Sequence, residues 1–308
     1  MPQSILRALG LLLRALTVVL VVGLSFAPRV DAASQLDPTL AISQYAHTAW
    51  RIEDGAFGGM PNAIAQTTDG YLWIGTDAGI VRFDGVRFIA WTPPIETPVP
   101  VAPVYALKGT RDGSLWIGTG RGVVRWDRDR LQTFPELVGR FNSFLEGGDG
   151  TVWAVRSRIG GTAVGALCHF MPSSGVRCFG QSDGIACQNA NAVVADSSGS
   201  LWFGGSNALC RRNLLETQTS TYLERELDFT GGLPGVTSLA SASDGSVWVG
   251  LAQSHNGLGL MRVTERGATN YVIPGFDGRQ IDIVALLVDA DNSLWVGTRT
   301  NASQCEAQ

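Results

Sequence analysis

Short apolar segments alternate with turns along most of the chain. Residues 63–66, 72–76, 80–83 and 86–91 are rich in β-branched and aromatic side chains, and they are separated by short stretches that contain glycine. Such segments favour β-strands, and Asp-Gly between two of them is a strong signal for a tight hairpin. The pattern therefore predicts antiparallel strands joined by short turns, with type I′ geometry at pairs such as Asp69-Gly70.

One motif of the form Asp-Gly-x-Leu-Trp-Ile-Gly-Thr recurs six times, in places with substitutions. Its tryptophans lie about 44 residues apart, at Trp73, Trp116, Trp153, Trp202, Trp248 and Trp295. Each full period has room for four strands, and four antiparallel strands in such a period correspond to one blade of a β-propeller. We therefore predict an all-β chain, a β-propeller of four-stranded antiparallel blades with about six repeats, the last of them incomplete.

The repeated tryptophan is predicted to be structural. A large apolar ring at the same place in every blade fills the space between neighbouring sheets, and its burial is worth about 1.5–3 kcal/mol. The glycine two residues later permits close backbone approach. The alternative, an aromatic surface that stacks on a ligand, requires these rings to be exposed.

The first residues have the features of an export signal. Arg7 and Arg14 precede an apolar run at residues 15–27, and Ala32 ends a small-residue cleavage site. The run is too short for a membrane span, which needs about 20 residues. We predict a signal peptide at residues 1–32, a linker at 33–43, propeller repeats at 44–300 and an irregular tail at 301–308. The mature chain is then expected in the periplasm or another extracytoplasmic space.

Charge and composition narrow the class of partner. The formal net charge is −4, and removal of residues 1–32 makes it −6. Nucleic acids are therefore not expected as partners, because phosphate binding needs a basic face. Charged residues make up 16% of the chain and 38 residues are glycine, which excludes a charged disordered tail. The expected partner is an unknown small molecule, a glycan or a periplasmic protein.

The chain has five cysteines, and cysteines can form disulfides in an oxidising compartment. Cys168 and Cys178 flank a predicted hairpin and are expected one residue out of register, so that a bulge would be needed to join them. Cys187 and Cys210 are expected to connect a loop and a strand of the next repeat. The alternative is that all five are small buried thiols.

Candidate catalytic and metal-binding chemistry is sparse. His47, His169 and His255 have no metal-like spacing, and residues 289–293 begin like a calcium loop but lack its later glycine and glutamate. No serine-hydrolase elbow or recurring carboxylate pair is present in the sequence. We therefore expect no catalytic residue, no metal, no cofactor and no enzymatic activity in this chain.

The first repeat resembles the two-component regulator propeller repeat. The resemblance rests on residues 50–55, 59–66, 69–76 and 79–85, and its motif extends over roughly residues 44–298. Residues 154–155 and 198 depart from it, so irregular blades are expected in repeats three and four. Residues 44–52 resemble a fourth strand without a blade of its own, and the unfinished last repeat leads us to expect a truncated chain.

The resemblance implies the periplasmic sensor region of hybrid histidine kinases and related receptors. It leads us to expect an extracytoplasmic propeller that binds a ligand or partner, with the membrane and kinase parts of the receptor missing from this chain. The alternative is a secreted propeller enzyme, either similar to streptogramin lyases or active on carbohydrates. A fold alone does not separate these functions.

Overall fold

A computed structural model describes most of the chain from Thr48 to Thr298. The described residues are 44, 48–93, 103–128, 130–157, 165–172, 175–206, 208–214, 219–222, 235–252, 259–264 and 266–298. The chain divides into one unit of residues 1–40 and a second of residues 41–308, and all described residues belong to the second. The predicted signal peptide, linker and tail lie outside the described residues.

Five four-stranded antiparallel sheets and a final hairpin follow one another along the second unit. The first sheet contains β1 (Pro61–Gln66), β2 (Leu72–Thr76), β3 (Gly79–Phe83) and β4 (Phe88–Trp91). The second contains β5 (Val104–Gly109), β6 (Leu115–Thr119), β7 (Val123–Asp127) and β8 (Arg130–Thr133). The third contains β9 (Arg140–Glu146), β10 (Val152–Ser157), β11 (Leu167–Met171) and β12 (Gly175–Phe179).

The remaining elements complete the arrangement. The fourth sheet contains β13 (Ala192–Ala195), β14 (Leu201–Gly204), β15 (Leu209–Arg212) and β16 (Thr219–Tyr222). The fifth contains β17 (Val236–Ser241), β18 (Val247–Leu251), β19 (Leu260–Thr264) and β20 (Gly267–Asn270), and the sixth repeat contributes β23 (Ile283–Val288) and β24 (Leu294–Thr298). A small hairpin of β21 (Val272–Ile273) and β22 (Phe276–Asp277) and two 3₁₀ turns, η2 (Gln181–Asp183) and η3 (Gly278–Gln280), lie between sheets.

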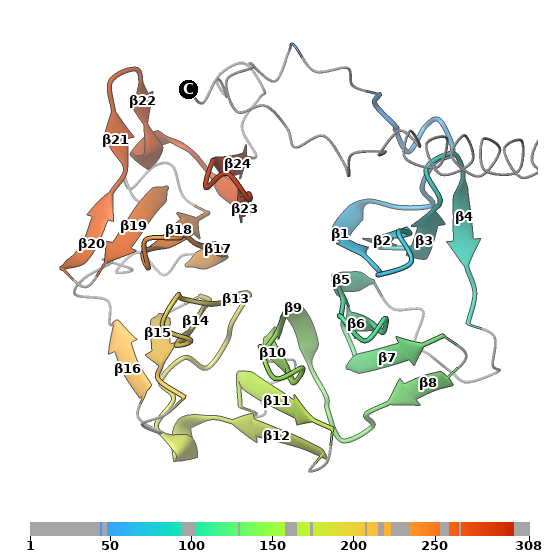
Figure 1. Ribbon diagram of the computed structural model, residues 1–308, viewed down its shortest axis with the longest axis horizontal. Coiled ribbons are helices and arrows are strands. Elements are labelled where there is room, and N and C mark those ends of the chain that lie inside the picture. The colour runs from blue at the N-terminus through green and yellow to red at the C-terminus, as the bar shows by residue number, and fades with distance from the viewer. Residues whose placement is uncertain are drawn as a thin grey trace, which may run out of the picture. The chain divides into compact units, whose positions relative to one another are not determined.

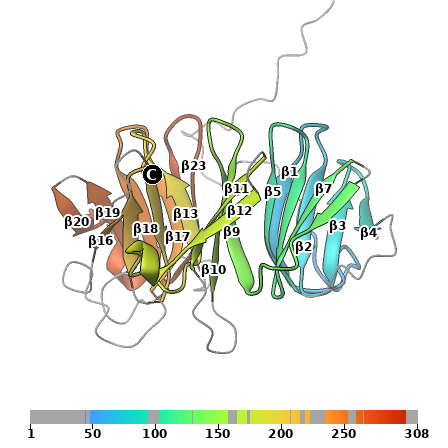
Figure 2. The same ribbon diagram turned by 90° about the horizontal axis from the view of Figure 1, so that it is seen from below.

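The sheets stand side by side as blades around a common axis (Figure 1). The first strand of each blade lies innermost, so that β1, β5, β9, β13, β17 and β23 are successive neighbours. Figure 2 shows the inner strands upright and the outer strands leaning over, which is the expected strand twist. The predicted all-β propeller of four-stranded antiparallel blades is confirmed, and the described part of the sixth repeat holds two strands.

The hairpin between the first two strands differs from the predicted type I′ turn. In the first blade, the N–H of Gly70 donates to the Thr67 carbonyl, and the N–H of Thr67 donates to the Tyr71 carbonyl. Gly70 has a left-handed φ of 89°, but Asp69 does not. This is a type I turn followed by one left-handed residue. The aspartate side chain accounts for the difference, because its carboxylate accepts a backbone N–H two residues later, as from Ser114 to Asp112 at 2.9 Å.

Neighbouring blades interlock through a missing side chain. A Cβ atom on Gly75 would lie 2.5 Å from a methyl group of Val104, the first residue of the next blade's inner strand. Gly204 likewise faces Val236 at 2.9 Å. The same arrangement brings Phe141 against Gly118 and Ile283 against Gly250. The repeated glycine is therefore a socket that receives one bulky side chain from the next blade.

The junction between the third and fourth blades inverts this arrangement. Val155 occupies the glycine position of β10, and Ala190 occupies the position of the bulky side chain. Both are fully buried in one cluster. Both sheets nevertheless have four strands, so the expected irregularity of these blades lies in their packing. The departure from the motif changes which of the two blades supplies the larger side chain.

Side chains also tie the inner strands together. At four junctions an amide or hydroxyl in or just before one inner strand donates to a backbone carbonyl at or just before the start of the next inner strand. These bonds run from Asn62 to Val104 (3.2 Å), from Asn142 to Ala190 (2.9 Å), from Asn191 to Val236 (3.0 Å) and from Thr237 to Ile283 (2.7 Å). At the remaining junction the Arg140 guanidinium lies 3.7 Å from the centre of the Tyr105 ring. Every junction between described blades thus combines an apolar lock with a polar or cation–π contact.

The prediction that residues 44–52 form an additional strand is wrong for the described part of that segment. Residues 48–52 are not in a strand. Trp50 instead packs on the outer hairpin of the first blade, with its ring centre 5.4 Å from those of both Phe83 and Phe88. Aromatic contact with these rings replaces backbone pairing.

The size inversion at Val155 and Ala190 predicts coupled effects on stability. Val155→Gly is expected to lower the free energy of unfolding by about 3 kcal/mol through a cavity, and Ala190→Val by about 1–3 kcal/mol through overpacking. The double variant recreates the pairing of Gly75 with Val104, so its loss should be smaller than the sum by at least about 1 kcal/mol. Urea denaturation without reductant measures the free energy of unfolding of the unchanged protein, the two single variants and the double variant. Val155→Gly combined with Val249→Ala, in another blade, should be additive, and additivity at 155 and 190 would contradict the inversion.

Candidate functional site

The six tryptophans of the motif lie in the second strand of their repeats. Five of them have exposed fractions between 1% and 8%: Trp73, Trp116, Trp153, Trp202 and Trp248. Trp295, in the final hairpin, is partly exposed. The five buried rings face neighbouring side chains of the core and therefore offer no open surface to a ligand.

In each of these five blades, a basic side chain of the third strand lies directly opposite the tryptophan of the second strand. It is arginine in four blades, as for Arg125 opposite Trp116, and histidine in the third. The Arg125 guanidinium lies 5.7 Å from the Trp116 ring centre and pairs with Asp112 of the turn at 2.7 Å. Burial acts to raise the pKa of Asp112, but hydrogen bonds from Thr110 and Ser114 and the charge of Arg125 together hold that pKa below its ordinary value. The motif aspartate thus forms its hydrogen bonds and its ion pair within its own blade.

His169 is the exception in the third blade. Its ring stacks in parallel on Trp153 with 3.8 Å between ring centres. Its Nε2 atom is buried, and the described residues provide no hydrogen-bond partner for it. Burial lowers the pKa of His169, and the negative charge of Asp149 opposes this shift only in part. The neutral imidazole is therefore the form that fits this blade.

Two disulfides lie in the third and fourth blades. Cys168 and Cys178 are joined with a Cα–Cα distance of 4.0 Å, and Cys187 and Cys210 with 6.3 Å. Cys168 lies directly opposite Cys178 because Met171 pairs with Gly175. The expected offset of one residue and its bulge are therefore wrong: the turn is one residue tighter than the sequence suggested.

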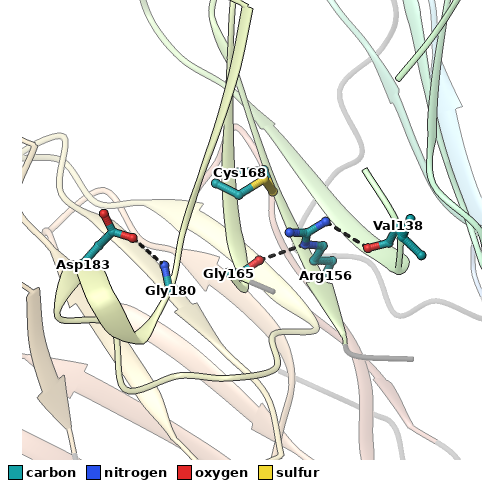
Figure 3. The surroundings of a disulfide bond; sticks show 7 residues. Val138, Arg156, Gly165, Cys168, Gly180 and Asp183 are labelled. Carbon is teal, nitrogen blue, oxygen red and sulfur yellow. Dashed lines mark hydrogen bonds between the residues drawn. A yellow bond between two sulfur atoms is a disulfide. The ribbon is translucent and has the colours of Figure 1, made fainter. Parts of the chain in front are cut away.

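A buried arginine anchors the backbone around the first disulfide (Figure 3). Arg156 donates from Nε to the Gly165 carbonyl at 2.8 Å and from Nη1 to the Val138 carbonyl at 2.9 Å. Burial lowers the pKa of its guanidinium. Arg156 thus holds two loop segments against the third blade, at a position that is threonine in the first, second and sixth repeats.

The remaining candidates for metal chemistry have other surroundings. His47 and His255 lie outside the described residues. The carboxylate of Asp289, at the start of the calcium-like segment, accepts from Trp295 Nε1 at 2.7 Å and from the N–H groups of Ser293 and Asp291. These bonds, with that from Trp295 the strongest, lower the pKa of Asp289. Within the described residues no group of three histidine, cysteine, aspartate or glutamate side chains is placed to hold a metal ion.

An open hollow lies where the first turns of the fourth, fifth and sixth repeats meet. Its volume is about 360 Å³, within the range of small-molecule sites. Each repeat contributes the same three consecutive positions, and Asn292 completes the wall. The lining residues are Ala195, Asp196, Ser197, Ser241, Ala242, Ser243, Val288, Asp289, Ala290 and Asn292. We call this site the turn-rim hollow.

Small side chains create the turn-rim hollow. Ser197, Ser243 and Ala290 stand at the turn position that Arg111 occupies in the second blade. Arg111 reaches across to the third blade, where it pairs with Glu146 at 3.1 Å and donates to the Gly147 carbonyl. The same space is thus bridged by an arginine in one part of the ring and left open in another. A run of small turn residues in repeats four to six was the available signal in the sequence, but it required knowledge of the blade order.

The hollow has a definite electrostatic character. None of the described residues that line it is basic. Its acceptors include Asn292, whose Oδ1 binds the Ser243 N–H at 3.0 Å, and the carboxylates of Asp196 and Asp289. Asp196 is largely committed to its own blade, through Trp202 Nε1 at 2.8 Å and Arg211 at 3.1 Å. The hollow therefore favours neutral or cationic ligands that donate hydrogen bonds over anionic ligands.

Comparison with known proteins agrees with this architecture. The two component regulator propeller family matches residues 57–78, and no curated protein matches the chain. The matched segment lies in the first repeat, where the sequence resembles the two-component regulator propeller repeat. Among the described residues, no helix is long and apolar enough to cross a membrane.

Solved structures with the same fold include proteins of different kinds. Virginiamycin B lyase from Staphylococcus aureus, in complex with quinupristin, is 17% identical with a TM-score of 0.58 over 77% of this chain and 76% of that chain. The extracellular domain of the putative hybrid two component system BT3049 from B. thetaiotaomicron is 17% identical with a TM-score of 0.63. The aligned region covers 82% of this chain and 34% of the BT3049 domain, so the chain spans about a third of that domain. At these identities the likeness establishes the fold alone.

The disulfide geometry predicts resistance to alkylation. Non-reducing peptide mapping of protein exported to an oxidising compartment should recover Cys168 linked to Cys178 and Cys187 linked to Cys210. Reduction should lower the free energy of unfolding by about 2–4 kcal/mol for each bond. Recovery of Cys168 and Cys178 as separately alkylated peptides without prior reduction would contradict the pairing.

His169 predicts a loss of stability in mild acid. Its folded pKa is lowered, so below about pH 6.5 the unfolded chain binds a proton that the folded blade does not. The free energy of unfolding should fall as pH drops from about 6.5 toward the folded pKa, by less than about 1.4 kcal/mol per pH unit because the ring is partly exposed. His169→Gln should flatten this part of the profile measured by urea denaturation. Arg125→Gln, at the equivalent position, should retain it, and an unchanged slope in His169→Gln would refute the assignment.

Proposed function

We propose that the chain is the extracytoplasmic sensor propeller of a two-component signalling receptor. In this proposal it binds a ligand or a partner, and membrane anchoring and kinase activity belong to other parts of the receptor. The observation that carries the proposal is the two component regulator propeller match at residues 57–78. The fold shared with the extracellular domain of BT3049 supports it.

The turn-rim hollow is the proposed ligand site. Three blades contribute equivalent positions to it, so a ligand there contacts several sheets at once. Such a ligand ties the blades together, because binding to the folded state alone stabilises that state. Its recognition depends on serine hydroxyls, Asn292 and backbone groups, and a neutral or cationic small molecule matches this lining. The chain itself is proposed to have no catalytic role.

A secreted lyase is the second candidate. The likeness to virginiamycin B lyase over 76% of that chain supports it. The two functions differ in the fate of the ligand, because a sensor releases it unchanged and an enzyme converts it. Incubation with quinupristin followed by liquid chromatography separates them: a steady loss of intact quinupristin that depends on the protein favours the lyase.

Substitutions that fill the turn-rim hollow test the sensor proposal. Thermal unfolding is measured with a panel of neutral saccharides, amino acids and polyamines. A binding compound at a free concentration of about 100 times its dissociation constant should add about 2.7 kcal/mol to the free energy of unfolding. Ser243→Trp and Ala290→Trp should each abolish the increase. Thr68→Trp, at the same turn position in the first blade and outside the hollow, should leave it intact.

The outcomes of this screen test the location of the ligand site separately from the function of the protein. A stabilising compound whose effect survives both Ser243→Trp and Ala290→Trp would place the ligand elsewhere. A compound that binds in the hollow but is chemically altered during incubation would contradict a sensor and support an enzyme.

A further inference from the structure

One junction of the ring shows what chemistry fills the space that the turn-rim hollow leaves open. Arg111 of the second blade donates from Nε to the Glu146 carboxylate at 3.1 Å and from Nη2 to the Gly147 carbonyl of the third blade. The backbone N–H of Arg111 also donates to both Glu146 oxygens, each at 3.1 Å. A guanidinium group, held by a carboxylate and a turn carbonyl, therefore bridges these two blades.

The carbonyl that receives Arg111 has equivalents in the turn-rim hollow. In each of these turns, the carbonyl accepts a backbone N–H from three residues later. These bonds run from Gly150 to Gly147 (3.1 Å), from Gly245 to Ala242 (3.1 Å) and from Asn292 to Asp289 (3.0 Å). A carbonyl oxygen has two lone pairs, and Gly147 uses the second for Arg111. Ala242 and Asp289 line the hollow, so their turns bring the same kind of acceptor to it.

The two tasks of Glu146 are divided between two residues of the hollow. Asn292 Oδ1 accepts the backbone N–H of Ser243 at 3.0 Å, which is the backbone bond that Glu146 makes at the other junction. Asp289 supplies a carboxylate one position further along the chain, and its hydrogen bonds, with that from Trp295 the strongest, lower its pKa. The carboxylate is therefore ionised at neutral pH. The junction of the fifth and sixth repeats keeps the acceptors and replaces the arginine with a serine.

We propose that the turn-rim hollow binds its ligand through an alkylguanidinium group, as in agmatine or the arginine side chain of a peptide. The guanidinium lies beside Ser243, in the place that Arg111 takes in its own junction, and donates to the carboxylate and the carbonyl of Asp289. A guanidinium suits these acceptors because its planar fork donates several hydrogen bonds at once, and bonds to a carboxylate are strengthened by charge. The described lining contains no basic side chain to repel it. This inference rests on the proposal that the hollow is the ligand site of a sensor, and it adds the chemical class of the ligand.

Butylguanidinium is the probe, and butylurea is its neutral counterpart of the same shape. Isothermal titration calorimetry with the complete mature protein should show saturable binding of one equivalent of butylguanidinium, with butylurea at least tenfold weaker. Agmatine and a blocked Gly-Arg-Gly peptide then distinguish the source of the group. Tighter binding of the peptide assigns a peptide ligand, and tighter binding of agmatine assigns a free guanidino compound.

Substitutions test the individual contacts. Ser243→Arg should fill the site with a guanidinium of the chain itself, and Asp289→Asn should remove its charge, so each should weaken butylguanidinium binding at least tenfold. Asp291→Asn removes a neighbouring carboxylate outside the lining, and Thr68→Arg adds an arginine at the same turn position of the first blade. Both should leave the dissociation constant unchanged. Arg111→Ala opens the equivalent junction and should raise the number of bound butylguanidinium ions from one to two.

Four results would overturn the proposal. The first is a lack of saturable butylguanidinium binding by a protein whose circular dichroism and thermal unfolding show that it is folded. The second is equal binding of butylurea, because the charge would then play no part. The third is binding that survives both Ser243→Arg and Asp289→Asn. The fourth is a single bound ion in Arg111→Ala, since the two junctions would then not be equivalent.

These results are separable from a failure of the proposed function. If butylguanidinium does not bind but another compound of the panel stabilises the protein and loses its effect in Ser243→Trp, the hollow remains the ligand site and the guanidinium class is wrong. If butylguanidinium binds as expected but the guanidino ligand is converted during incubation, the class is correct and the sensor function is wrong. Liquid chromatography of the incubated ligand distinguishes the second case.

Discussion

The close approach of one blade's second strand to the next blade's first strand is the constraint on which the ring depends. A glycine at Gly75, Gly118, Gly204 or Gly250 removes a side chain at the point where the sheets converge, and a Val, Phe or Ile fills the space. Packing at this density leaves little tolerance for a change in volume. The tryptophan two residues earlier packs in the same cluster as that side chain, as Trp73 does with Val104 and Trp248 with Ile283. The polar contacts of the inner strands then fix each blade in rotation against its neighbour.

Much of this architecture could be predicted because it depends on local repetition. Trp73 and its equivalents define the blade period, and the short strands around them follow from residue type. The turn at Asp69 was misjudged because its carboxylate accepts a backbone N–H and stabilises a different turn. The relation of Cys168 to Cys178 was misjudged by one residue because the hairpin register depends on the turn. The turn-rim hollow could not be predicted, since it combines small residues from three repeats that become neighbours only in the folded ring.

The same positions serve different purposes around the ring. The residue opposite the tryptophan is arginine in four of the five described four-stranded blades and His169 in the third, so among these five the third blade carries an imidazole at that position. The turn position that Arg111 uses to bridge two blades is small in repeats four to six and opens the hollow. A uniform scaffold therefore acquires local differences in shape and charge through single exchanges at equivalent sites. This is consistent with a fold whose relatives include both a lyase and an extracellular domain of a signalling system.

The exchange of bulk between Val155 and Ala190 makes the order of the blades part of the fold. If the third blade were moved in front of the second, the fifth or the sixth, Val155 would meet Val104, Val236 or Ile283, and two bulky side chains would compete for one place. If the fourth were moved behind a glycine-bearing blade, Ala190 would leave that socket empty. Duplication, deletion or circular rearrangement of single repeats is therefore tolerated only where these two blades travel as a pair. The third and fourth blades must therefore remain neighbours, whereas the other blades share the same junction geometry.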